Sequence, residues 1–156
     1  MRKKFIVFIL ILILLCFFAS CTRQENQTEI YSFSGENENI TINNGLIIVT
    51  DDSEKFIGGN LSFRGEEPLD VKDYFERFFF YKDGNEKTIL NNATTTVGST
   101  EGLHISSDLG SISSENLFYN NDLELIKESL NFLISGKLMN GEGFEYDLTL
   151  VVKKVY

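Results

Sequence analysis

Hydrophobic and polar residues alternate with a period of two along most of the chain after residue 29. Residues 30–34, 40–43 and 56–63 show this alternation, and residues 46–49 form an unbroken run of leucine, isoleucine and valine. Alternation indicates a strand with one buried face, whereas a short β-branched run indicates a strand buried on both faces. The first half of the chain is therefore predicted to form several short strands.

Glycine-containing pairs separate or interrupt these strands. Asn44-Gly45 is the strongest short hairpin signal, with a bulge inside one long strand as the alternative. Gly58-Gly59 predicts a kink within residues 56–63, and Asp83-Gly84 predicts a turn.

Residues 70–82 (DVKDYFERFFFYK) fit two patterns. Val71, Phe75, Phe78 and Phe79 recur at a spacing that suits one face of a helix. The set without Phe78 but with Tyr81 also falls on one side of a strand. The density of aromatic residues favours the strand, which is our interpretation, with the helix as the alternative.

The second half of the chain ends in the most regular pattern of the sequence. Residues 131–139 and 144–155 flank the turn-forming residues 140–143, and they predict a hairpin. Residues 123–130 contain enough leucine, isoleucine, glutamate and lysine for a helical turn or two. Residues 88–114 are rich in threonine, serine and glycine, so we expect short edge strands and loops there.

About seven short strands with turn signals between them predict a mainly β fold. The expected architecture is an antiparallel β-sandwich, immunoglobulin-like in broad shape, formed by residues 30–156 as a single domain. The length suits one ordinary domain better than two.

The N-terminal segment has the organisation of a secretory signal. Three cations follow Met1, residues 5–18 are apolar, and Ala19-Ser20-Cys21 supplies small residues at the end. An uncleaved anchor helix is the alternative, but the apolar run is short against the roughly 20 residues of a spanning helix. Either reading places the residues after Cys21 on the extracytoplasmic side, because the cations stay inside.

The end of this segment resembles the lipobox of bacterial lipoproteins, with Phe18 where leucine is usual. The resemblance implies removal of residues 1–20 and attachment of a diacylglycerol lipid, with acyl chains such as palmitate, to the sulfur of Cys21. Cys16 follows Leu14-Leu15, which are too bulky for a cleavage site. Residues 21–29 are then a polar tether, and the expected location is the extracytoplasmic face of the cell membrane.

Both cysteines of the chain lie in this segment. The domain after it therefore has no disulfide, thiolate zinc site or cysteine nucleophile, and it must depend on its hydrophobic core. Without residues 1–20 the net charge is about −12. Such an acidic surface repels phosphate backbones, so we expect no nucleic-acid partner.

Candidate catalytic residues are sparse. The one histidine, His104, lies close in sequence to Ser106, Ser107 and Asp108. Neighbours along one strand cannot align as nucleophile, base and orienting group, so a surface histidine is the expectation. We expect no enzyme, no cofactor and no catalytic residue.

An acidic cluster at Asp51-Asp52-Ser53-Glu54 offers oxygen ligands for calcium. It lacks the spaced pattern of a calcium loop, which favours a solvated turn, and we expect no metal site.

The segments FSGENENI (residues 33–40) and LSFRG (residues 61–65), followed by the Thr/Ser/Gly-rich stretch and the closing hairpin, resemble small, uncharacterised lipoproteins of Firmicutes with a β-sandwich domain. The chain lacks tryptophans at the first strand and the closing hairpin, where this resemblance implies them. It implies a fold and a membrane anchor, and it implies no chemistry.

The function expected from these features is that of a binding or structural module of the cell envelope, with residues 88–114 as the candidate surface and an envelope protein or peptide as partner. The alternative is an immunity-type lipoprotein that intercepts a toxic protein or peptide, for which an acidic charge suits a cationic attacker. An envelope hydrolase is the third hypothesis.

Overall fold

The structure is a computed structural model that describes residues 28–97, 101–119 and 121–156. The described part is mainly β and antiparallel, as expected, with one short helix. Its elements are β1 (Glu29–Glu36), β2 (Ile40–Val49), β3 (Glu54–Ile57), β4 (Asn60–Phe63), β5 (Val71–Lys82), β6 (Asn85–Thr95), β7 (Ser111–Ser114), α2 (Asp122–Ser129), β8 (Leu130–Leu138) and β9 (Gly143–Lys154).

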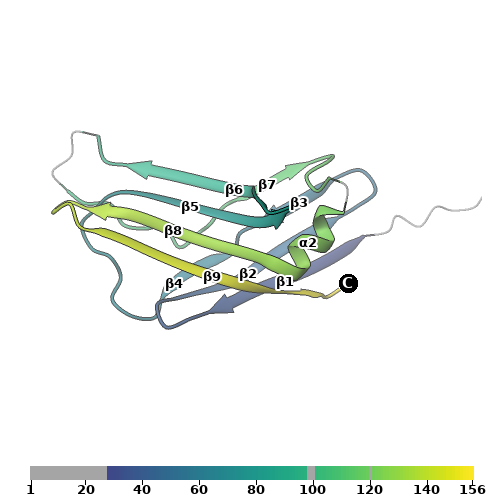
Figure 1. Cartoon of the computed structure of the whole chain (residues 1–156), viewed down its shortest axis with the longest axis horizontal. Coiled ribbons are helices and arrows are strands. Elements are labelled where there is room, and N and C mark those ends of the chain that lie inside the picture. Colours follow the sequence, from purple (N-terminus) through teal and green to yellow (C-terminus); the bar gives the residue numbers. More distant parts are fainter. Residues whose placement is uncertain (1–27, 98–100, 120) are drawn as a thin grey trace, which may run out of the picture.

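The strands form a continuous sheet that curls nearly into a barrel. Their order is β6-β5-β8-β9-β1-β2-β3-β7, with β4 paired to β2 beside β3. Strand β9 joins two layers, because residues 143–150 pair with β8 and residues 151–154 pair with β1 (Figure 1). The layers face each other across one core, which confirms the sandwich in its broad form.

The strand interpretation of residues 70–82 and the closing hairpin are both confirmed. Strand β5 pairs with β6 on one side and β8 on the other. Tyr74, Phe78 and Phe80 are buried on one side of β5, which is an inner strand of this layer. The helix between residues 123 and 130 is present as α2.

Asn44-Gly45 lies inside β2, so the bulge reading of this pair holds and the hairpin reading does not. Asn44 has φ 61°, and the register between β1 and β2 shifts between Phe33 and Gly35. The strand bends here because its first half pairs with β4 and its second half with β3. Gly58-Gly59 separates β3 from β4, which confirms the predicted kink.

Residues 88–114 differ from the expectation of short strands and loops. Their first part belongs to β6, which is eleven residues long. The strand was not visible as alternation because residues 91–95 are exposed on both faces, so neither face requires apolar side chains. Strand β7, four residues long, matches the expected short edge strand.

The core is built around four phenylalanine rings, one each from β1, β3, β5 and β8. The ring of Phe78 lies 5.7 Å from Phe33, 5.0 Å from Phe56 and 5.0 Å from Phe132, measured between ring centroids. Helix α2 packs on the same core through Ile126, which is fully buried. An ion pair of 2.6 Å between Lys82 and Asp122 joins the end of β5 to the start of α2.

The predictions for the N-terminal segment concern residues that lie outside the described part of the chain. They are the signal segment 1–20, the lipid-bearing Cys21 and nearly all of the tether 21–29. No helix in the described part of the chain is long and apolar enough to cross a membrane.

Candidate binding edge and the hollow beside it

Strand β6 is hydrogen-bonded along one of its edges. Among the residues that the structure describes, its backbone pairs with β5, and no other strand pairs with its outer edge. All of residues 91–95 are exposed. The outer edge of β6 is therefore a row of backbone N–H and C=O groups open to solvent, in a strand long enough to pair with another. We call this row the β6 edge.

From residue 90 to residue 95 the β6 edge lacks the usual protection of an edge strand. Residues 88–95 (TILNNATT) contain no charged residue and no proline, although both are common devices against unwanted pairing. A bulge at Ile89 shifts the register with β5, but the strand continues regularly from Leu90 to Thr95. The opposite end of the sheet is the four-residue β7, which is protected by its short length.

The segment of residues 103–110, and not β6, covers the gap in the nearly closed barrel. The Leu103 N–H donates to the carbonyl oxygen of Val71 at 2.7 Å, and the Leu109 N–H donates to the carbonyl of Gly59 at 3.1 Å. Ile105 and Leu109 are buried beneath this segment. Because the segment closes the core, β6 extends beside the barrel with its own edge free.

One side chain of β6 nevertheless fixes the strand to the core. The Asn92 amide donates to Oε1 of Glu76 at 3.0 Å and to the carbonyl oxygen of Leu109 at 3.4 Å. Glu76 points inward from β5 and is 4% exposed. Within the described residues, its Oε2 has no hydrogen-bond partner.

Burial raises the pKa of Glu76 above its ordinary value. The hydrogen bond from Asn92 acts in the opposite direction, and the negative charge of Asp108 raises the pKa further. The hydrogen bond between Asn92 and Glu76 thus positions β6. The burial of the Glu76 carboxyl costs free energy of folding.

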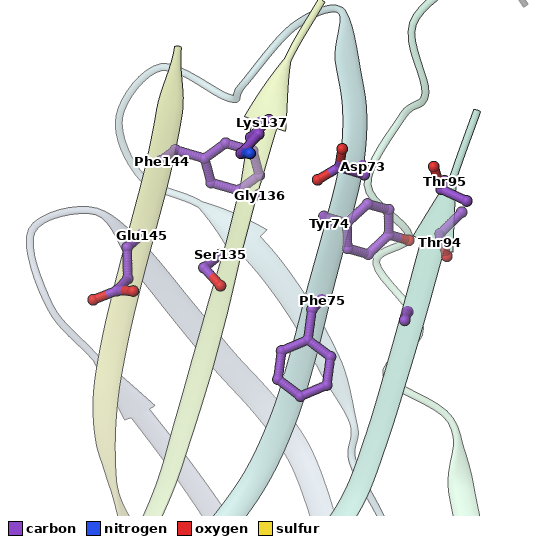
Figure 2. A pocket seen from close by; sticks show the side chains of 11 residues that line it. Asp73, Tyr74, Phe75, Thr94, Thr95, Ser135, Gly136, Lys137, Phe144 and Glu145 are labelled. Carbon is purple, nitrogen blue, oxygen red and sulfur yellow. The ribbon is translucent and has the colours of Figure 1, made fainter. Parts of the chain in front are cut away.

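A hollow of about 560 Å³ lies on the sheet at the end of β6. Figure 2 shows Phe75 and Asp73 on β5, with Ser135 and Lys137 on β8 and Thr95 on β6 around it. The lining residues come from four adjacent strands and are Asp73, Tyr74, Phe75, Ala93, Thr94, Thr95, Ser135, Gly136, Lys137, Phe144 and Glu145.

The register of the strands explains why the sheet is hollowed here. Phe75 lies opposite Ser135 on one side and opposite Ala93 on the other. Small side chains on both neighbours leave part of the half-buried Phe75 ring uncovered. Arg77, the next residue on the same face, has its guanidinium carbon 5.7 Å from the centre of that ring, and it also pairs with Glu86 at 2.6 Å.

The charges at the rim of the hollow are unpaired. Asp73, Lys137 and Glu145 line it, and none of them forms an ion pair or side-chain hydrogen bond with another described residue. Two carboxylates and one ammonium group give the rim an excess of negative charge. An apolar floor with a charged rim can hold one long side chain or a small polar molecule.

The residues near His104 do not form a catalytic constellation. His104 is exposed. The Ser106 hydroxyl donates to the backbone carbonyl of Asp108 at 3.1 Å, and the Asp108 carboxylate accepts the N–H of Gly110 at 2.9 Å. Ser106 and Asp108 therefore stabilise the turn before β7, in a segment whose role is to cover the core.

The acidic cluster of residues 51–54 is a turn whose oxygens point in different directions. The Asp52 carboxylate accepts the Thr50 hydroxyl at 2.9 Å, and Oε2 of Glu54 accepts the N–H groups of Leu117 and Phe118, each at 2.6 Å. In residues 28–97, 101–119 and 121–156, no three His, Cys, Asp or Glu side chains are grouped to hold a metal ion.

Sequence reasoning placed the candidate surface within residues 88–114 but missed the strand that forms its first part. The signal that was available is the absence of charge and proline over residues 88–95 after the Asp83-Gly84 turn. In comparisons with known proteins, no protein-family model, curated protein or solved structure matched the chain.

Proposed function

We propose that the protein is a lipid-anchored binding module of the cell envelope that accepts an extended segment of a partner protein beside β6. The observation that carries this proposal is the uncovered β6 edge, an eleven-residue strand paired on one side and free of charge over residues 88–95. A partner strand that pairs with it forms main-chain hydrogen bonds of about 1 kcal/mol each and extends the sheet.

The charge of the protein favours a foreign partner over a second copy of the chain. Each copy without residues 1–20 carries a net charge of about −12, so edge-to-edge pairing of two copies brings like charges together. A cationic partner is instead steered toward the domain. The proposal therefore commits to a basic, extended segment of another protein.

The anchor in this proposal is Cys21, on the sequence grounds given above. A diacylglycerol group supplies two chains, which suffice for stable attachment. Cys21→Ser should leave the precursor unprocessed and unlabelled in cells fed a radioactive fatty acid. The control is Cys16→Ser, which should be processed and labelled normally. Normal processing of Cys21→Ser would refute the anchor and leave the β6 edge untouched.

The binding role can be tested with a displayed library of random twelve-residue peptides. The full-length chain, solubilised in mild detergent, is immobilised and panned against the library. Peptides that bind by strand addition should slow hydrogen exchange at the outward-facing N–H groups of β6 and leave exchange in β1 and β2 unchanged. Protection elsewhere, with none in β6, would contradict the proposal.

A pair of matched variants separates the edge from general electrostatics. Thr88→Lys with Thr94→Lys places two cations on β6, as natural edge strands often do, and should weaken peptide binding at least tenfold. Val151→Lys with Val155→Lys adds the same charge at two positions that are each 58% exposed near the C-terminus. Equal losses in the two double variants would show that net charge, and not the edge, governs binding.

Interception of a toxic cationic protein or peptide is the second candidate function, and the acidic charge favours it. It uses the same edge and differs in its consequence for the cell. Cells without the protein should then be more sensitive to such a toxin, and the Thr88→Lys, Thr94→Lys variant should not restore resistance. Full resistance of cells that carry this variant would show that protection against the toxin does not depend on the β6 edge.

A further inference from the structure

The hollow beside β6 lies where a side chain of an added strand would fall. Residues of a strand paired to β6 alternate between the two faces of the sheet, as do Ala93 and Thr94 within β6. The partner residue opposite Ala93 would extend the cross-strand row formed by Glu145, Ser135, Phe75 and Ala93. Its side chain would point to the face on which Phe75 forms the floor of the hollow.

Ala93, which lies between that side chain and Phe75, is too small to block contact between them. Neighbouring strands are separated by about 4.8 Å, so the partner backbone lies about two strand spacings from Phe75. A long side chain can cross the single methyl group of Ala93 and reach the ring, whereas a short one cannot. The distance therefore selects lysine, arginine or a large apolar residue.

The charges around Phe75 favour the basic side chains among these. Asp73 lies on the same face of β5 two residues before Phe75, and its carboxylate has no ion-pair partner among the described residues. Lys137 lies opposite Asp73 on β8 and forms no ion pair with it, and Arg77, beside the Phe75 ring, is already paired with Glu86 at 2.6 Å. A cation over Phe75 would gain both the ring face and the free Asp73 carboxylate.

We infer that the segment bound at the β6 edge carries a lysine or arginine whose side chain crosses Ala93 and ends between Phe75 and Asp73. This inference rests on the proposed function and names the specificity-determining contact within it. The hollow then provides specificity for one side chain of the partner. The β6 edge supplies main-chain hydrogen bonds that do not depend on the partner's sequence.

The peptide library described above gives a first test. Enriched peptides should alternate with period two and share one basic residue at a fixed position. One such peptide is then synthesised with lysine and with norleucine at this position, and the affinity of each for the full-length chain is measured by calorimetry. The lysine peptide should bind about tenfold more tightly.

Two conservative variants locate the cation. Asp73→Asn should weaken the lysine peptide about fivefold and leave the norleucine peptide unchanged. Asp147→Asn, which removes an exposed carboxylate of β9 outside the hollow, should change both affinities less than twofold. A lysine preference that survives Asp73→Asn would overturn the inference.

The outcomes also separate this inference from the proposed function. Peptides that protect β6 but share no basic position would overturn the inference and leave strand addition standing. A library that yields no peptide protecting β6 would overturn both.

Discussion

Phe33 of β1 lies directly over Gly45, its cross-strand neighbour in β2. A Cβ atom placed on Gly45 would be 2.1 Å from a carbon of the Phe33 ring. The bulge at Asn44-Gly45 thus serves the core as well as the bend of β2, because the missing side chain is the space in which the ring lies.

We predict that Gly45→Ala destabilises the protein by about 3 kcal/mol, because the ring must leave its place in a packed core. Denaturant unfolding followed by circular dichroism measures this. The control is Gly65→Ala, since an added Cβ there meets no atom within 4 Å. A Gly45→Ala variant as stable as the control would refute the packing described for Phe33.

Phe78 joins the two layers of the sheet through its contacts with Phe33, Phe56 and Phe132. Phe78→Ala should cost about 4 kcal/mol in the free energy of unfolding, as expected for a large cavity in the core. Phe75→Ala is the matched control, because Phe75 belongs to the same strand but lies half-buried on the opposite face. A loss at Phe75 equal to that at Phe78 would contradict this assignment of faces.

Glu76 should make stability depend on pH. Because burial raises its pKa in the folded protein, the folded state holds the proton at pH values where the unfolded state has released it. Its stabilising contribution is therefore present below about pH 4.5, the ordinary carboxyl value, and is lost as the pH rises through the raised pKa.

Replacement of the Glu76 carboxyl by a neutral amide removes the loss of folding stability at high pH. Glu76→Gln should be more stable than the wild type at pH 8, by about 1 kcal/mol, and nearly equal to it at pH 4. Melting temperatures across this range measure the difference, with the exposed Glu145→Gln as control. A pH dependence that Glu76→Gln leaves intact would assign it to other groups.

Glu54, although it belongs to the acidic cluster of residues 51–54, fixes a distant loop through backbone hydrogen bonds. Its Oε2 accepts the backbone N–H groups of Leu117 and Phe118, which lie 63 and 64 residues away in the sequence. Glu54→Gln should lower stability by about 1 kcal/mol, because hydrogen bonds to an ionised acceptor are the stronger ones. Asp52→Asn, which alters an exposed bond to Thr50, should cost about 0.5 kcal/mol or less. Equal losses would argue against the loop contact.

The predictable parts of the fold are those in which the pattern of apolar and polar side chains follows their burial. The β8–β9 hairpin alternates apolar and polar residues because one face is buried, and β5 contains aromatic residues because it lies in the middle of its layer. These patterns are local, so the sequence alone was enough. The helix α2 was visible for the same reason, through its leucine and isoleucine residues.

The candidate site was only partly visible. Residues 88–114 were recognised as a polar surface, but β6 within them shows no alternation because its second half is exposed on both faces. A free strand edge is made of backbone groups, which have no signature in the side chains. The hollow depends on Ala93 and Ser135 lying on either side of Phe75, across strands that are distant in the chain.

The sequence by itself determined that the chain after its N-terminal segment forms a mainly β domain without cysteine, held by aromatic and aliphatic side chains. Only the tertiary structure decided that Glu76 is buried beside Asn92, that residues 103–110 cover the core, and that β6 is left with an open edge. The physical reason is that strand order and register bring together residues separated by long loops. Period-two alternation fixes which way a side chain points but does not fix which strand lies beside it.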